Sequence, residues 1–266
     1  MRRGAMIRRS FELLGARFLG IVRYVGGGSL LLGQTLFWIP MPPIRRRPIF
    51  EQMSKIGVDS IMIVSLISMF TGMVLALQSA YQMKKFSAEM YIASLVAISM
   101  TRELAPVLTA LIVAGRVGAS ITAELGTMKV TEQIDALETL ATNPVKYLVV
   151  PRFLAMVIMI PLLTLYADAI GGLGGYIIGT TKLHISHAMY MKNTWDPLRY
   201  KDIYTGIIKS FFFAMIICIV ACYEGMKADG GAEGVGKATT SSVVTSFILI
   251  IASDCFFTAL FYFVGR

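Results

Sequence analysis

Charged side chains stand inside long apolar stretches of this sequence, where they could bind a polar substrate group or relay a proton. A charge at bilayer depth costs at least a few kcal/mol, so it normally faces a cavity or a partner of opposite charge. The charged residues in these stretches are Asp59, Arg102, Glu103, Arg116, Glu124, Asp168 and Asp254. Asp59 and Glu124 stand at the ends of their stretches, so we expect them at the membrane surface.

Arg102 and Glu103 form the deepest charged pair. Glu103 lies twelve residues into its stretch, about 18 Å along a helix and therefore near mid-membrane. Neighbouring residues on a helix point in different directions, so the two side chains are expected to have different partners. Pro106 has no N–H and is expected to kink the helix and free nearby carbonyl groups. An interhelical ion pair and a place on a substrate pathway are both open for this pair.

A short amphipathic segment follows that stretch. Its apolar stripe is Val130, Ile134, Leu137 and Ala141, and its acidic row is Glu132, Asp135 and Glu138. Asn143-Pro144 is expected to end the helix. Because an acidic face suits anionic lipid headgroups poorly, the segment is predicted to dock onto a soluble protein.

The segment Gly231–Lys237 has the glycine and lysine spacing of a nucleotide-binding phosphate loop. Ala238 stands where Ser or Thr would ligate magnesium, and the strand-to-helix context of such loops is not expected here. We interpret the segment as a tight turn into the last apolar stretch. No catalytic residues and no metal ligands can be assembled elsewhere, so neither is expected on this chain.

These residues must be positioned by elements that lie in lipid. Of 266 residues, 56% are hydrophobic and 15% are charged, whereas soluble domains have about 45–50% and about 25%. A membrane protein is therefore expected. Its formal charge of +9 suits anionic lipid, and without a basic stripe interleaved with aromatic residues no nucleic-acid partner is expected.

The hydropathy pattern predicts an all-α protein with about five transmembrane helices. The expected spans are Ser60–Met83, Tyr91–Glu124, Tyr147–Thr180, Ile203–Met226 and Ala238–Gly265. Lys and Arg residues number fifteen on the side of the N-terminus and eight on the other, with Lys209 counted among the eight. This excess favours a cytoplasmic N-terminus. In the third span, Gly171, Gly175 and Gly179 predict close helix packing.

Residues 1–50 are predicted to form an amphipathic elbow in the membrane interface, and residues 51–266 the transmembrane domain. The apolar face of the elbow is Ile7, Phe11, Leu14, Phe18, Ile21 and Val25. Gly26–Gly28 is expected to interrupt this helix, and Pro40, Pro42 and Pro43 to close the segment.

Several sequence blocks resemble the MlaE (YrbE) family, the permease subunits of ABC transporters that work with MCE-domain proteins. The blocks are Arg102–Val107, Ala114–Gly118, Ala123–Met128, Thr131–Leu137 and Gly231–Thr240. The resemblance runs from about Phe50 to the C-terminus.

The resemblance implies a homodimeric lipid permease in the bacterial inner membrane. ATP and magnesium would bind a separate cytoplasmic ATPase, so no cofactor is expected on this chain. A periplasmic MCE-domain protein would be a partner, and a small cytoplasmic accessory subunit is a further candidate. The cargo would be a phospholipid or a related lipid.

The resemblance also implies roles for particular residues. Leu75, Gln78 and Tyr81, with Arg102 and Glu103, would line the lipid pathway. Thr131, Glu132, Gln133, Asp135 and Leu137 would form a cytoplasmic coupling helix that docks on the ATPase. The alternatives are an ion-coupled carrier that uses Glu103, Asp168 and Asp254, and a scaffold that recruits a soluble partner without transport.

Overall fold

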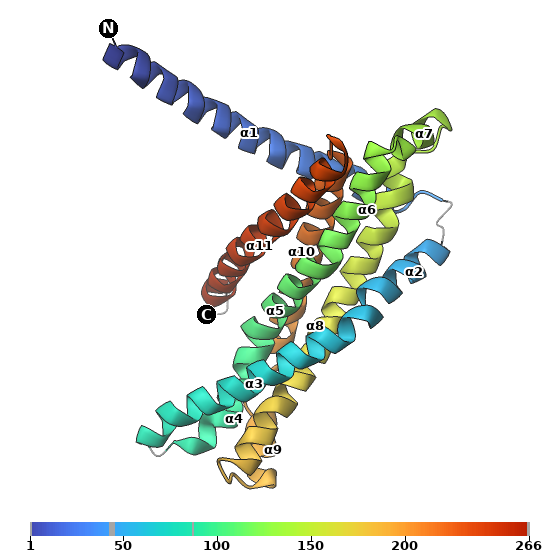
Figure 1. Cartoon of the computed structure of the whole chain (residues 1–266). Coiled ribbons are helices and arrows are strands. Elements are labelled where there is room, and N and C mark those ends of the chain that lie inside the picture. The colour runs from blue at the N-terminus through green and yellow to red at the C-terminus, as the bar shows by residue number, and fades with distance from the viewer. Residues whose placement is uncertain (1, 43–45, 87, 265–266) are drawn as a thin grey trace.

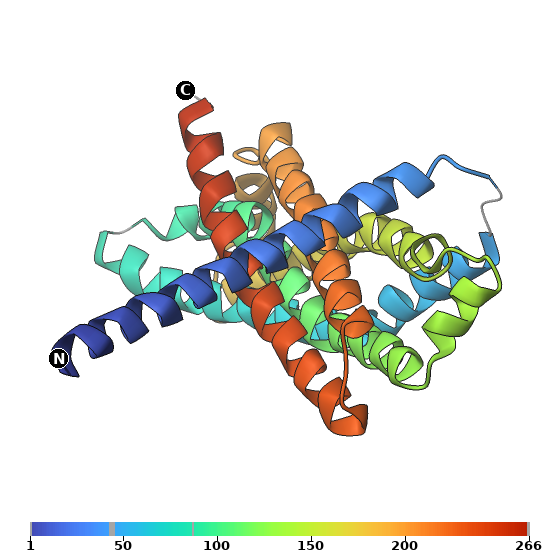
Figure 2. The same ribbon diagram turned by 90° about the horizontal axis from the view of Figure 1, so that it is seen from above.

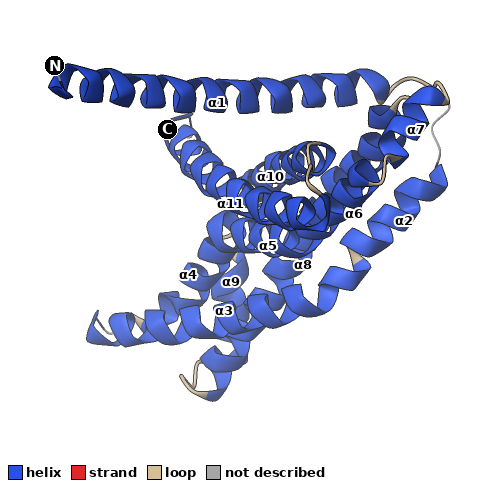
Figure 3. Cartoon of the chain, turned by 45° about the horizontal axis from the view of Figure 1, so that its top comes forward, coloured by secondary structure: helices blue, strands red, loops and turns tan. Residues whose placement is uncertain are grey.

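The computed structural model describes residues 2–42, 46–86 and 88–264, which form helices and short turns with no strand among them (Figures 1 and 3). Five helical stretches are long and apolar enough to cross a membrane: Arg46–Phe86, Glu89–Val130, Val145–Thr181, Tyr200–Met226 and Gly231–Phe263. The prediction of an all-α membrane protein with five spans is confirmed.

Short 3-10 or π-helical segments interrupt the first two spans, and another begins the third. The first span contains α2 (Arg46–Ile56), η1 (Val58–Ser60) and α3 (Ile61–Met83). The second contains α4 (Ile92–Ser99), η4 (Met100–Leu104), α5 (Ala105–Val113), η5 (Ala114–Gly118) and α6 (Ala119–Val130). The third contains η6 (Val145–Val149) and α8 (Val150–Thr181). The last two spans are α10 (Tyr200–Met226) and α11 (Gly231–Val264). The segments η4, η5 and η6 are π-helices.

The two ends of the bundle carry different short elements. The helix α7 (Gln133–Thr139) lies at the same end of the bundle as α1 (Arg2–Trp38), and α9 (His187–Trp195) lies at the other (Figure 1). The 3-10 turns η2 (Lys84–Phe86) and η3 (Glu89–Tyr91) join the first two spans near α9. The second span therefore begins at the α9 end and leads directly into α7.

Glycines let α8 approach its neighbours closely. A Cβ added to Gly72 of α3 would overlap the carbonyl of Gly171, and one added to Gly174 would overlap the carbonyl of Met69. Gly175 and Gly179 make room for Tyr190 of α9. Small residues allow such contacts in lipid, where no hydrophobic force drives helices together. The predicted glycine stripe thus packs helices within one chain.

The Gly174→Ala substitution is expected to destabilise the protein by about 2–3 kcal/mol, since the methyl group has to push α3 away from α8. Thermal unfolding in mild detergent measures the loss. The matched control is Gly172→Ala on the same helix, where a Cβ would meet nothing within 4 Å. Equal unfolding temperatures for the two variants would contradict this packing.

The first helix is longer and straighter than predicted. α1 has 37 residues and passes through Gly26–Gly28 without a break. A glycine costs only about 1 kcal/mol in a helix, and Gly27 is needed here because a Cβ would overlap the Tyr223 hydroxyl. The Tyr24 ring also packs edge-on against Tyr223, with 5.1 Å between centroids. Figure 2 shows α1 crossing the end of the bundle, with its N-terminal part extending beyond the other helices.

Candidate functional site

A polar cavity of about 370 Å³ lies between the second, fourth and fifth spans, at the α9 end of the bundle. Its lining includes the basic residues Arg102, Arg199, Lys201 and Lys209, the acidic residues Glu103 and Asp202, and the aromatic residues Phe261 and Tyr262. Because basic side chains outnumber acidic ones, the lining favours an anionic group. The aromatic wall offers an apolar surface beside it.

Lys209 is the centre of the charge network under this cavity. Its side chain is only 1% exposed, and its ammonium donates to Glu103 Oε2 at 2.5 Å and to Thr258 Oγ1 at 2.7 Å. Asp254 Oδ1 lies 2.9 Å away and pairs with it by charge, although its geometry does not make a hydrogen bond. Thr258 in turn donates to Glu103 Oε1 at 3.1 Å. Lys209 thus joins the second, fourth and fifth spans.

Pro106 explains why Lys209 reaches the backbone as well. A residue at this position would normally donate its N–H to the carbonyl four residues earlier, which is that of Arg102, and proline has no N–H. Lys209 Nζ donates to the Arg102 carbonyl at 3.2 Å instead. This bond agrees with the prediction that Pro106 affects nearby carbonyl groups, and the π-helix η4 precedes the proline.

Arg102 has a different partner, as predicted for neighbours on a helix. Its guanidinium contacts Asp202 Oδ1 through Nε at 2.6 Å and through Nη2 at 2.5 Å. Asp202 is buried at the start of α10, where Oδ2 also accepts from the Arg199 N–H at 3.0 Å. The Arg102 side chain stays 51% exposed on the cavity side. The guanidinium has five N–H donors on a planar group, and those that do not face Asp202 suit a phosphate or carboxylate.

The three residues predicted on the first span lie apart from this cavity. None of Leu75, Gln78 and Tyr81 belongs to its lining. Leu75 packs against a buried apolar cluster of α3, α4 and α8, and Gln78 is exposed. Tyr81 is 72% exposed, with the Lys85 ammonium 5.1 Å from its ring centroid. Of the five residues predicted to line the pathway, only Arg102 and Glu103 line this cavity within one chain.

The other charges predicted inside the spans have separate partners. Arg116 donates to Ser60 Oγ at 2.7 Å and lies 3.6 Å from Asp59. Glu124 pairs with the buried Arg152 at 3.0 Å. Asp168 has one buried carboxylate oxygen without a hydrogen-bond partner, and it is not joined to Glu103 or Asp254 by any contact among the described residues. The three carboxylates of the ion-coupled alternative therefore form no continuous relay in one chain.

The predicted coupling segment forms a helix at the α7 end, with different bounds. α7 begins at Gln133, and Thr131 and Glu132 form a turn before it. Glu132 has a φ of 61°, a left-handed conformation that reverses the chain after α6. Asn143 does not end α7; its side chain caps the start of η6 by accepting from the Val145 N–H at 2.9 Å.

The outer face of α7 is acidic with an apolar tip. Ile134 is buried against the bundle and Leu137 packs beside it. Glu132, Gln133 and Asp135 are exposed, and Asp135 pairs with Lys129 at 2.7 Å. Leu140, which the predicted stripe omitted, is 75% exposed just after the helix. A partner with basic residues around an apolar pocket would complement this face.

The phosphate-loop spacing belongs to a helix. Gly231–Lys237 forms the first two turns of α11, with Lys237 paired to Glu233 at 2.7 Å. The prediction that the whole segment forms a turn is wrong, because the chain turns at Gly230 and at the first residue, Gly231, with φ of 87° and 72°, and the rest is helical. A regular helix has no loop to wrap around a phosphate.

Of the residues that line the polar cavity, the sequence predicted only Arg102 and Glu103, and it missed two charged partners that hold them. Lys209 was counted among the outside charges, whereas it is buried inside α10. Asp202 directly precedes the predicted span Ile203–Met226 and was given no role, whereas it lies in the first turn of α10 and pairs with Arg102. The burial of Lys209 could have been predicted from its neighbours, because it stands between the largely apolar runs Ile203–Ile208 and Ser210–Phe213.

Comparison with known proteins places the chain in a family. The family model Permease MlaE matches residues 49–260. A probable ABC transporter permease of Rickettsia conorii is 47% identical over 94% of this chain and 96% of its own. The intermembrane phospholipid transport system permease protein MlaE of Haemophilus influenzae is 36% identical over 98% and 100%. A chloroplast protein of Arabidopsis thaliana, TRIGALACTOSYLDIACYLGLYCEROL 1, is 35% identical over 89% and 67%.

The family model covers α7, the second, third and fourth spans in full and nearly all of the first and fifth. The protein is therefore a multi-pass membrane permease subunit of an ABC transporter and belongs to the MlaE family.

Proposed function

We propose that this permease moves a glycerophospholipid through the bacterial inner membrane, between the bilayer and an MCE-domain protein on the periplasmic side. The charged cavity beside Arg102 carries the proposal, because it joins a net basic lining to an aromatic wall. A phospholipid has the same two parts, a phosphate and apolar chains. The phospholipid transport name of the Haemophilus influenzae relative supports the same cargo.

The two ends of the second span are suited to different functions, lipid binding at one and ATPase docking at the other. Arg102 and Glu103 lie near its start and α7 follows its end, about 40 Å away along the helix. In this proposal a cytoplasmic ATPase binds ATP and magnesium and docks on Glu132, Asp135 and Leu140. The N-terminus and α7 then lie on the cytoplasmic side, and the charged cavity lies towards the periplasm.

A second copy of the chain would complete the pathway. α11 is the least covered of the five described spans, with 11% of its most apolar part buried, and Val244, Ile248 and Ile251 are exposed along it. A homodimer that buries this face would bring the charged cavities of two copies together. We propose that Leu75, Gln78 and Tyr81 border the pathway only in that dimer.

The test replaces the ion pair of the cavity, the half-exposed Arg102 and the buried Asp202. In Arg102→Gln with Asp202→Asn, both charges disappear together, so no unpaired buried charge remains. Proteoliposomes containing the chain and its co-purified ATPase are expected to lose ATP-driven phospholipid movement at least about tenfold, the effect of one lost charged hydrogen bond. The measurement is the redistribution of fluorescent phosphatidylethanolamine between leaflets.

The matched control is Arg116→Gln with Asp59→Asn, which removes another arginine–aspartate pair attached to the same span. It is expected to keep most of the transport. Undiminished transport in the Arg102 and Asp202 variant would contradict a phosphate site. Transport driven by a proton or sodium gradient without ATP would favour the ion-coupled carrier.

A further inference from the structure

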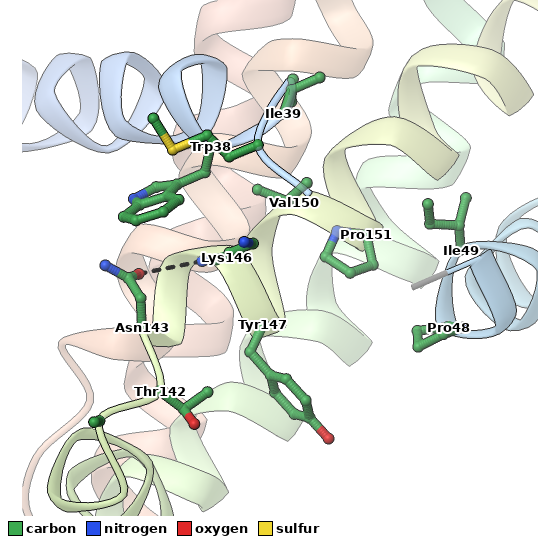
Figure 4. Close-up of a pocket in the computed structure, with 12 residues that line it drawn as sticks. Trp38, Ile39, Pro48, Ile49, Thr142, Asn143, Lys146, Tyr147, Val150 and Pro151 are labelled. Atoms are coloured by element: carbon green, nitrogen blue, oxygen red, sulfur yellow. Dashed lines mark hydrogen bonds between the residues drawn. The ribbon is translucent and has the colours of Figure 1, made fainter. Parts of the chain in front are cut away.

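A second cavity, of about 330 Å³, lies at the α7 end of the molecule. It is enclosed by the end of α1, the start of α2 and the segment that leads from α7 into α8 (Figure 4). Neither the charged cavity nor the acidic face of α7 includes it. Its volume falls within the roughly 300–1,000 Å³ of small-ligand pockets.

Lys146 connects the walls of this cavity. Its ammonium donates to the Pro42 carbonyl at 3.0 Å and lies 5.3 Å from the centroid of the Trp38 ring. Asn143 Oδ1 accepts from the Lys146 N–H at 3.2 Å, which fixes the backbone that carries the lysine (Figure 4). The position of this cation is thus set by α1 and η6 together.

The lining is divided between apolar and polar residues. Ile39, Ile49, Val150 and Pro151 supply apolar surface, and Asn143 and Lys146 supply polar groups. Apolar surface beside a lysine suits an amphipathic anion better than a water-soluble metabolite. Two protons of the ammonium remain for such a ligand beyond the bond to Pro42.

The cavity also lies at the depth where a lipid headgroup would be. Val145 begins the third span, so Lys146 stands at the end of the apolar stretch. Tyr147 and Trp38 lie beside it, and aromatic and basic residues gather at membrane–water interfaces. Basic pockets at span ends commonly bind acidic headgroups.

We propose that this cavity binds one anionic glycerophospholipid of the adjacent leaflet, with its phosphate on Lys146 and an acyl chain along Ile39, Val150 and Pro151. This lipid is a resident ligand, separate from the transported one, so the inference does not depend on the proposed function. An occupied cavity would hold α1 against the segment that joins α7 to α8.

The two tryptophans of the chain, Trp38 and Trp195, allow a direct test. In Trp195→Phe, all tryptophan fluorescence comes from the cavity. The full chain is reconstituted in phosphatidylcholine vesicles with a minor fraction of phosphatidylglycerol, and one lipid or the other is dibrominated. Quenching by brominated phosphatidylglycerol is expected to be about fivefold stronger than the fraction of this lipid in the vesicle predicts. A fivefold preference corresponds to about 1 kcal/mol, the attraction of one basic residue for anionic lipid.

Two further variants define the site. Lys146→Gln is expected to reduce the quenching to the lipid's share, and Lys146→Arg to preserve the excess. In Trp38→Phe, the remaining Trp195 in α9 reports the opposite end of the molecule and is expected to show no preference. If each brominated lipid quenches Trp38 only in proportion to its fraction in the vesicle, the proposal is overturned. Relief of the quenching on adding the ATPase would also overturn it, since the cavity would then receive protein.

Discussion

Lys209→Met is expected to lower the free energy of unfolding by about 3–5 kcal/mol, the cost of breaking a buried ion pair on one side. Glu103 and Asp254 would lose the cation between them, and the Arg102 carbonyl would lose its donor. Transport is expected to disappear with the fold of the cavity. Thermal unfolding in detergent and ATP-driven lipid movement measure the two effects.

A neutral variant separates the fold from the function. Lys209→Met with Glu103→Gln and Asp254→Asn removes all three charges, and replacing a whole buried network is often neutral for stability. We expect the unfolding temperature to recover while transport stays lost. If transport recovers as well, the network serves only to hold the spans together. A single Lys209→Met variant as stable as the native protein would contradict the burial of this lysine.

The second large effect concerns the acidic turn and helix. Glu132→Lys with Asp135→Lys is expected to weaken co-purification of the ATPase on the order of 100-fold, because like charges opposed in an interface cost several kcal/mol. Neither side chain is buried, and Ile134 still anchors α7 to the bundle. The fold should therefore persist. Quantitative mass spectrometry of the purified chain measures the bound ATPase.

The matched control has the same change in net charge at the same end of the molecule. Glu51→Lys with Glu233→Lys reverses two exposed acids, each of which pairs with a basic residue one helical turn away. It is expected to retain the ATPase. Equal loss in both variants would indicate a general charge effect, and equal retention would remove α7 from the docking surface.

The spans were predictable because lipid demands a property that the sequence displays directly. A segment that crosses the bilayer must be apolar for about twenty residues, so the five spans stand out. The charges inside them were equally visible. Their partners were not, because Arg102 and Asp202 lie on different helices and only the packed bundle brings them together.

The errors have a common physical origin. Lys209 was counted with the charges outside the membrane although the predicted span Ile203–Met226 contains it, and its burial depends on two carboxylates from other spans. The run Gly26–Gly28 was expected to break α1 because glycine is a poor helix former, and the contact with Tyr223 overrides that preference. The bounds of α7 depend on a left-handed residue, Glu132, whose side chain gives no hint of it.

The π-helices η4 and η5 allow the second span to change its twist. A π-turn holds about one residue more than an α-turn, so this span contains spare length at two positions, Met100–Leu104 and Ala114–Gly118. Conversion of η5 to α-helix would rotate everything between it and α9 by about 100° relative to α6. Arg102 and Glu103 would then turn away from α10 while α7 stayed in place. A change at η5 would therefore alter the contacts of Arg102 and Glu103 with α10 without displacing α7.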